Sequence, residues 1–242
     1  MTFSLFRKIV YFFLPQRLIW ACLIHIVPNF IARIRYLLQG IVPLWQQDKF
    51  FLTLYKDVKS VTLLDKSRAY VVYQLCKQCQ FLSGSMAELG VYRGGTLRLI
   101  SKLNHKRKFI YGFDTFEGFP DFDSNINHTW SQGQLKASFE TLQSEICDKE
   151  VVLIKGVFPA SVHQIPKNSR FCFVHLDTDL YEGTLEGCKY FFSRLVTGGI
   201  LLIDDYGLVS CKGVKQAVDI FFADKKEKPV YLPTGQCFIM KI

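Results

Sequence analysis

The chain has 242 residues and lacks several features that define common protein classes. Its first 47 residues contain no aspartate or glutamate, and the longer of two apolar runs there, residues 18–31, has only 14 residues and includes Pro28. A membrane-spanning helix needs roughly 20 apolar residues, so this run is too short to cross a bilayer as a helix. No small-residue cleavage site of the A-x-A type follows it, which argues against a cleaved signal peptide.

The cysteines and the basic residues also lack the clustering that specialised sites require. Eight cysteines are scattered along the chain, and the C-x-x-C spacing of Cys76 and Cys79 has no second pair or nearby histidine. We therefore expect buried thiols in a reducing compartment, which points to the cytoplasm. The net charge is +9, but five of these charges precede Asp48, and the remaining +4 forms no basic stripe. Nucleic acid is not an expected partner.

Residues 1–47 differ in composition from residues 48–242, and we expect them to form a separate helical extension. Their apolar runs are flanked by basic residues, namely Arg7, Lys8, Arg17, Arg33 and Arg35. Basic helices rich in aromatic residues can lie in a membrane interface, and the absence of acids favours contact of residues 1–40 with anionic headgroups at the inner membrane face. The alternative is an extension that packs on the main domain or on a partner subunit of a homo-oligomer.

The rest of the chain predicts an α/β domain. Residues 50–61 and 67–82 have the apolar spacing of helices. From there the pattern alternates strand, turn and helix, which predicts a parallel, Rossmann-like sheet with helices on both faces. We expect strands at 86–90, 109–113, 151–154, 171–176 and 199–203, a helix at 96–104, and a last strand or hairpin within 229–241.

Two of the predicted strands end on aspartate pairs. Residues 171–176 lead into Asp177 and Asp179, and residues 199–203 lead into Asp204 and Asp205. In an open parallel sheet, ligands gather at the carboxyl ends of the strands, so neighbouring strands would bring four carboxylates to one edge. Four carboxylates this close together repel one another unless a cation lies among them. The sequence thus predicts a metal site, although aspartates also end strands simply because they favour turns.

A glycine-rich turn follows the first strand. The sequence E-L-G-V-Y-R-G-G-T runs from Glu88 to Thr96, and its glycines let the backbone approach a ligand at the N-terminus of the next helix. The second strand ends in Asp114, about 20 residues after the glycine turn. Nucleoside-binding sheets place a carboxylate that binds ribose hydroxyls at this spacing in the sequence. Glu88 lies within the first strand and needs a partner, either a cationic ligand such as a sulfonium amino acid or a structural salt bridge.

Four motifs together resemble the macrocin O-methyltransferase family: E-L-G-V-Y-R-G-G-T, F-D-T-F-E-G-F-P, H-L-D-T-D-L-Y-E-G-T and G-G-I-L-L-I-D-D-Y-G. They occur in the family's order within residues 65–242. The resemblance implies a class I methyltransferase fold and methylation of a sugar hydroxyl that depends on S-adenosylmethionine and Mg²⁺. It also implies dimers or larger assemblies.

The resemblance also implies roles for individual residues. Asp177, Asp204 and Asp205 would hold Mg²⁺, and Asp179 would act as the general base. The methionine part of the cofactor would lie near Glu88, and Asp114 would bind the ribose. The residues expected to bind S-adenosylmethionine are Glu88, Gly90, Tyr92, Gly94, Gly95, Thr96, Asp114, Thr115 and Phe116.

Three functional hypotheses follow. The first is the sugar O-methyltransferase, acting on a glycosylated natural product, a glycolipid or a surface polysaccharide precursor. The second is a membrane-associated, metal-dependent glycosyltransferase, because residues 177–179 also form a D-x-D motif. The third is a binding protein that keeps the fold but not the reaction. The polar residues 121–134 form a long loop that could cover a substrate with Asp123, His128 and Trp130, or be a plain solvated loop. His175 is interpreted as a core histidine or as a substrate contact.

Overall fold

The structure is a computed structural model, and it describes residues 38, 40, 42–123, 125–126 and 129–242. The predictions of membrane or subunit contact through residues 1–40 lie almost wholly outside the described residues, and so does His128. Within the described part of the chain, no helix is both long and apolar enough to cross a membrane.

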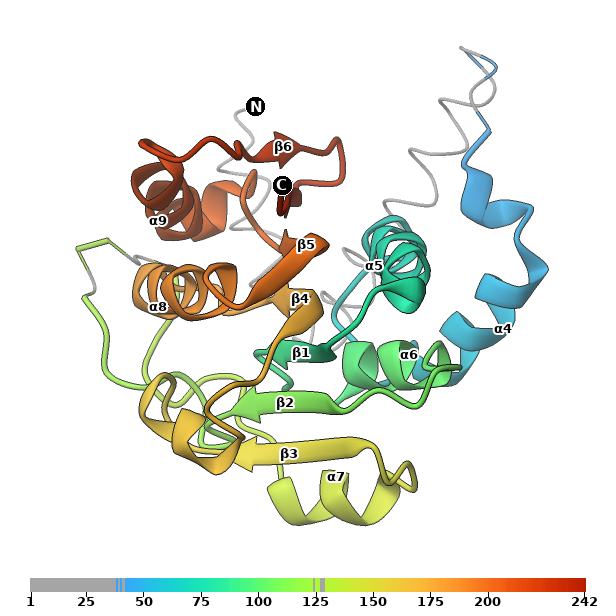
Figure 1. Cartoon of the computed structure of the whole chain (residues 1–242), viewed down its shortest axis with the longest axis horizontal. Coiled ribbons are helices and arrows are strands. Elements are labelled where there is room, and N and C mark those ends of the chain that lie inside the picture. Colours follow the sequence, from blue (N-terminus) through green and yellow to red (C-terminus); the bar gives the residue numbers. More distant parts are fainter. Residues whose placement is uncertain (1–37, 39, 41, 124, 127–128) are drawn as a thin grey trace, which may run out of the picture.

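A seven-stranded sheet with the order β3-β2-β1-β4-β5-β7-β6 forms the centre of the molecule (Figure 1). The pairs β3–β2, β2–β1, β1–β4 and β4–β5 are parallel, whereas β7 runs antiparallel to both β5 and β6. The strands are β1 (Ser85–Leu89), β2 (Ile110–Asp114), β3 (Val151–Lys155), β4 (Phe171–Leu176), β5 (Leu195–Ile203), β6 (Val230–Tyr231) and β7 (Cys237–Met240). The predicted parallel sheet with a C-terminal hairpin is confirmed.

Helices cover both faces of this sheet, as predicted, and two apolar cores result (Figure 1). Helices α4 (Lys49–Val58), α5 (Lys66–Gln78) and α6 (Gly95–Lys102) pack on one face, and α8 (Tyr181–Phe192) and α9 (Lys212–Phe222) pack on the other. Adjacent strand residues serve opposite cores: Met86 belongs to the first and Ala87 to the second. Helix α7 (Phe139–Glu145) lies beside the edge strand β3.

Helices α4 and α5 begin at capping aspartates. Asp48 accepts a hydrogen bond from the backbone amide of Phe51, and Asp65 accepts from those of Ser67 and Arg68. Both helices are shorter than predicted. Helix α4 ends at Val58, and α5 ends at Gln78, from where a 3-10 turn (Cys79–Phe81) completes the segment.

Strand β5 starts at Leu195, four residues before the predicted strand. Leu195 pairs with Phe171, and the register shifts between this pair and the pair formed by Phe173 and Ile200. Gly198 has a φ of +79°, which accommodates the irregularity within the strand. The predicted start of this strand at residue 199 was therefore wrong.

The cysteines of the described chain form no disulfides. Six of them are buried, and only Cys147 is exposed. Burial raises the pKa of Cys76 above its usual range, so this residue is a packed thiol. The interpretation of the C-x-x-C spacing as two buried thiols is confirmed.

Candidate active site

A cavity of about 1100 Å³ opens at the carboxyl ends of the central strands. Its wall is built from the loops that follow β1, β2, β4 and β5, together with residues 61–64, which precede α5. Loops at this edge of an open α/β sheet form the usual ligand site of such folds. In the described chain, six non-glycine residues have positive φ, and five of them lie in these loops, namely Tyr92, Phe116, Leu135, Asp179 and Asp205. Strained backbone of this kind is concentrated at functional sites.

Asp114 joins two of these loops. One of its carboxylate oxygens accepts a hydrogen bond from the backbone amide of Tyr92 (2.7 Å), and the other accepts from that of Phe116 (2.7 Å). The loops after β1 and β2 are thereby fixed against one another at the cavity wall. A carboxylate held in this way at the end of β2 is correctly placed to accept hydrogen bonds from the hydroxyls of a ribose.

The glycine turn allows two close backbone approaches. A Cβ atom on Gly90, which has a φ of +95°, would lie 1.8 Å from the carbonyl oxygen of Asp177, so β1 and β4 could not approach as they do. A Cβ on Gly95 would lie 2.6 Å from the Cα of Thr62. The hydroxyl oxygens of Thr62 and Thr96 lie 3.4 Å apart, so the segment 61–64 is seated directly on the start of α6.

Not all of the predicted cofactor residues reach the cavity. Those that line it are Gly90, Tyr92, Gly95, Thr96, Asp114 and Thr115. Gly94 instead packs against Leu142. Phe116 is buried in the first core, where its ring lies 5.1 Å from that of Phe139. These two residues support the wall from behind.

Glu88 is paired within the protein. Its Oε1 lies 2.9 Å from Nδ1 of His175, both side chains are buried, and neither lines the cavity. Burial raises the pKa of Glu88 even though His175 opposes the shift. Burial alone would lower the pKa of His175, but the hydrogen bond to Glu88 together with the charges of Glu88, Asp177 and Asp204 outweighs it and raises that pKa. The structure thus contains a structural pair of Glu88 and His175, with His175 in the core. Both were among the alternatives predicted for these residues.

The four aspartates come together as predicted. Asp177, Asp204 and Asp205 offer oxygen atoms that all lie within 4.8 Å of one another, and Asp179, Asp205 and Cys211 form a second such group. Burial raises the pKa of Asp177, Asp179 and Asp205 well above the usual range, and the charges of their aspartate neighbours add to the effect. Ionisation of all four carboxylates would therefore create more negative charge than the surroundings neutralise.

This cluster fits a divalent metal ion. One oxygen of Asp204, Oδ1, is buried and has no hydrogen-bond partner among the described residues. Carboxylate oxygens are the ligands that Mg²⁺ prefers, and the Asp177, Asp204 and Asp205 group includes no histidine or thiol that would favour zinc. Asp177, Asp204 and Asp205 are thus suited to hold Mg²⁺.

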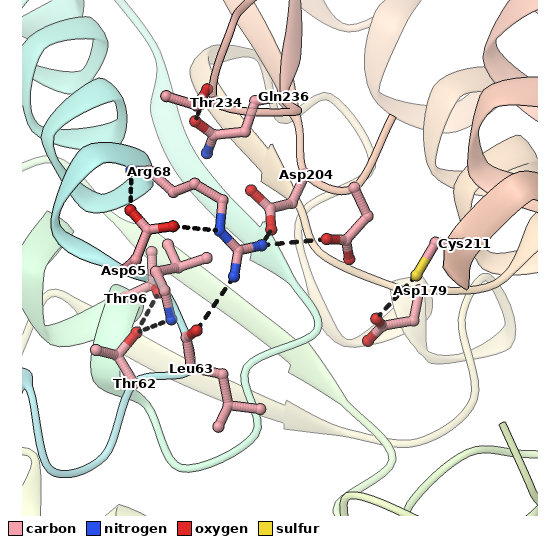
Figure 2. Close-up of polar contacts among 12 residues, drawn as sticks. Thr62, Leu63, Asp65, Arg68, Thr96, Asp179, Asp204, Cys211, Thr234 and Gln236 are labelled. Carbon is pink, nitrogen blue, oxygen red and sulfur yellow. Dashed lines mark hydrogen bonds and ion pairs between the residues drawn. The ribbon is translucent and has the colours of Figure 1, made fainter. Parts of the chain in front are cut away.

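Arg68 is a site residue that the sequence interpretation missed. Its guanidinium donates to both Asp204 and Asp205 and lines the cavity (Figure 2). Burial alone would lower the pKa of Arg68, but the two carboxylates outweigh it and raise the pKa, so the side chain stays charged. The sequence gives no indication of this contact, because Arg68 lies 136 residues before Asp204.

The loop between β2 and α7 covers part of the cavity. Asp121, Thr129 and Trp130 contribute to the lining, and the ring of Trp130 lies 5.3 Å from that of Phe119. The indole nitrogen of Trp130 is buried without a hydrogen-bond partner in the described chain. The backbone amide of Asp123 donates to Glu182 of α8 (3.2 Å), which ties the loop across the opening.

Comparison with known proteins decides the family. Residues 62–231 match the model of the macrocin O-methyltransferase (TylF) family. The chain belongs to this family. The matched region agrees with the resemblance predicted for residues 65–242 and leaves the N-terminal segment outside.

Relatives that are named for their activities match only part of this chain. The 8-demethyl-8-(2,3-dimethoxy-alpha-L-rhamnosyl)-tetracenomycin-C 4'-O-methyltransferase of Streptomyces olivaceus is 27% identical over 145 residues, which cover 53% of this chain and 55% of that protein. The mycinamicin III 3''-O-methyltransferase of Micromonospora griseorubida is 25% identical over 147 residues, which cover 53% of this chain and 58% of that protein. The chain spans little more than half the length of the relatives that it matches.

Solved structures confirm the fold. The O-methyltransferase NovP superposes with a TM-score of 0.63 at 22% identity, covering 74% of this chain and 81% of that one. The calicheamicin methyltransferase CalS11 superposes with a TM-score of 0.64 at 21% identity, covering 72% and 78%. The predicted class I methyltransferase fold is thereby confirmed for this family member.

Proposed function

We propose that the protein transfers a methyl group from S-adenosylmethionine to a sugar hydroxyl of a glycosylated natural product, a glycolipid or a surface polysaccharide precursor, with the help of Mg²⁺. The observation that carries the proposal is the presence, in one cavity, of the doubly hydrogen-bonded Asp114 and the aspartate cluster. The first suits a ribose and the second suits a metal ion. The names of the relatives support the choice of acceptor, because they describe methylation of a rhamnosyl-tetracenomycin and of mycinamicin III.

One set of residues binds S-adenosylmethionine, and another acts on the acceptor hydroxyl. Asp114 and the residues of the glycine turn that line the cavity bind the cofactor, next to the start of α6, which no side chain caps. Asp177, Asp204 and Asp205 would hold Mg²⁺, which would lower the pKa of an acceptor hydroxyl. Asp179 takes the hydroxyl proton, since its raised pKa makes it a better base than an ordinary aspartate.

The reaction is a displacement in line with the sulfonium. The acceptor oxygen forms a bond to the methyl carbon while the bond from sulfur to that carbon breaks, giving a methyl ether and S-adenosylhomocysteine. Positioning contributes most of the rate in such a reaction. The covering loop, whose Trp130 lines the cavity, limits the access of water to the two reactants.

Family membership favours methyl transfer over the glycosyltransferase hypothesis. A direct test supplies S-adenosylmethionine with a labelled methyl group to a panel of rhamnosylated and other glycosylated acceptors, with Mg²⁺ or with EDTA. We expect label in an acceptor with Mg²⁺ and its loss with EDTA and in Asp179→Asn. The control is Asp57→Asn, which changes an exposed acid paired with Lys102. Nucleotide-sugar binding without S-adenosylmethionine binding would overturn the proposal.

The division at residues 47 and 48 belongs to the same proposal. Residues 1–40 would bring the enzyme to the inner membrane face, where lipid-linked saccharides are found, or would contact a second subunit. Deletion of residues 1–40 tests this, because a peripheral protein would move from the membrane fraction to the supernatant. If the full chain already remains in the supernatant as a dimer that the deletion dissociates, the segment serves as a subunit contact.

A further inference from the structure

Arg68 connects the aspartate cluster to residues 61–64, another part of the cavity lining. It lies in the first turn of α5, and its side chain is 15% exposed. Nη1 donates to Oδ2 of Asp204 and, at 3.1 Å, to Oδ1 of Asp205 (Figure 2). A single guanidinium nitrogen thus bridges two adjacent carboxylates and fixes one oxygen of each.

The guanidinium is also held from behind. Nη2 donates to the carbonyl oxygen of Leu63 (3.1 Å), and Nε lies 3.6 Å from Oδ2 of Asp65. Asp65 is fixed in turn, since its other oxygen caps α5 by accepting from Ser67 and Arg68. Figure 2 shows Arg68 between Asp65 and Leu63 on one side and Asp204 on the other. Arg68 is therefore held firmly in the site, because a movement of its guanidinium away from the aspartates would also break its contacts with Leu63 and Asp65.

Arg68 does not provide a hydrogen-bond partner for every oxygen of the aspartate cluster. Oδ1 of Asp204 remains buried without a partner in the described chain, and one guanidinium charge faces four carboxylates. A buried carboxylate oxygen without a partner carries a desolvation cost that a further cation would remove. Arg68 occupies Oδ2 of Asp204, so Oδ1 is the oxygen of this carboxylate that is left for a metal ion.

We propose that Arg68 is a positioning residue for the divalent cation: it fixes the Asp204 and Asp205 carboxylates in the orientation that presents their remaining oxygens to the metal. The inference rests on the proposed metal dependence. Because the same guanidinium donates to the carbonyl oxygen of Leu63, it also connects the aspartates to residues 61–64, which line the cavity as well. The opposite role, a cation that takes the metal's place, predicts the opposite effect of removing Arg68.

The test is calorimetric titration of Mg²⁺ and Mn²⁺ into the full chain, saturated with S-adenosylhomocysteine. Loss of a group that orients metal ligands usually weakens metal binding about ten- to hundredfold, and we expect this for Arg68→Gln. Arg68→Lys keeps the charge but cannot bridge the same groups, so it should restore only part of the affinity. The matched control is Arg98→Gln, which removes an arginine of α6 from its ion pair with Glu145 of α7 and should leave metal binding unchanged.

The outcomes separate this inference from the proposed function. If the wild type binds neither ion, the metal site and the role of Arg68 both fail. If the wild type binds metal and Arg68→Gln binds it equally or more tightly, only the role of Arg68 fails. If Arg68→Gln does not fold, Asp65→Ser provides the test of the role of Arg68. Serine can still cap α5, but the substitution removes the carboxylate beside Nε of Arg68. Weaker metal binding by Asp65→Ser supports the inference, and unchanged binding overturns it.

Discussion

The carboxylate of Asp114 accepts a hydrogen bond from the backbone amide of Tyr92, which lies 22 residues earlier in the chain. Together with the amide of Phe116, this contact fixes the loops after β1 and β2 at the wall of the cavity. The residue that we expect to bind the ribose therefore also shapes the pocket that receives it.

Replacement of Asp114 by asparagine should weaken cofactor binding. The amide side chain keeps one acceptor oxygen but loses the charge and the second acceptor, so either Tyr92 or Phe116 loses its partner. Hydrogen bonds to charged groups contribute about 1.5–3 kcal/mol, and one such loss corresponds to about ten- to hundredfold weaker binding. Calorimetry with S-adenosylhomocysteine measures the effect, and unchanged affinity would contradict this role of Asp114.

Gly90→Ala should be far more harmful than Gly133→Ala. Both glycines have positive φ, +95° and +77°, so both substitutions carry the backbone strain of about 1–2 kcal/mol expected for an alanine there. Only at Gly90 would the new Cβ meet the backbone of Asp177, at 1.8 Å, whereas nothing lies within 4 Å of it at Gly133. Urea unfolding compares the two variants. Equal stabilities would show that the close approach of β1 and β4 is unimportant.

Asp177→Asn and Asp179→Asn should fail in different ways. Asp177 belongs to the group suited to hold the metal, so its substitution should weaken Mg²⁺ binding. Asp179 is expected to take the proton, so its substitution should lower kcat by about 10²–10⁴ while cofactor affinity is retained. Metal titration and turnover with a competent acceptor separate the two roles. Identical defects in both variants would argue that all four aspartates act only as one metal site.

Substitutions of Glu88 can distinguish a structural role of this residue, its pairing with His175, from a role in cofactor binding. Glu88→Ala leaves His175 buried without its partner, and breaking a buried pair in this way costs about 3–5 kcal/mol of stability. Glu88→Gln keeps an acceptor for His175 and should lose much less. If Glu88→Gln binds S-adenosylmethionine as tightly as the wild type, the charge of Glu88 acts within the fold. A large loss of affinity at retained stability would restore the prediction that Glu88 serves the methionine part of the cofactor.

The parts of the site that were predicted from the sequence are those that follow from strand ends. Parallel strands bring their carboxyl ends to one edge, so Asp177 and Asp205 could be placed together once β4 and β5 were taken as neighbours. The same argument placed Asp114 beside the glycine turn. These inferences need only the order of the strands, which the alternating pattern and the family motifs supply.

The parts that were missed depend on packing across the sheet. The contact of Arg68 with Asp204 requires the position of α5 on the sheet, which no local pattern encodes. The pairing of Glu88 with His175 requires the register of β1 against β4, in which these two residues are direct neighbours. A charged residue inside a predicted strand indicated that Glu88 needed a partner, but only the register identifies His175.

The most direct test of the proposed function is calorimetric titration of the full chain with S-adenosylmethionine, with and without Mg²⁺. We predict micromolar binding that does not require Mg²⁺, since the residues expected to bind the cofactor are separate from the aspartates suited to the metal. Absence of binding under both conditions would contradict the assignment as a methyltransferase.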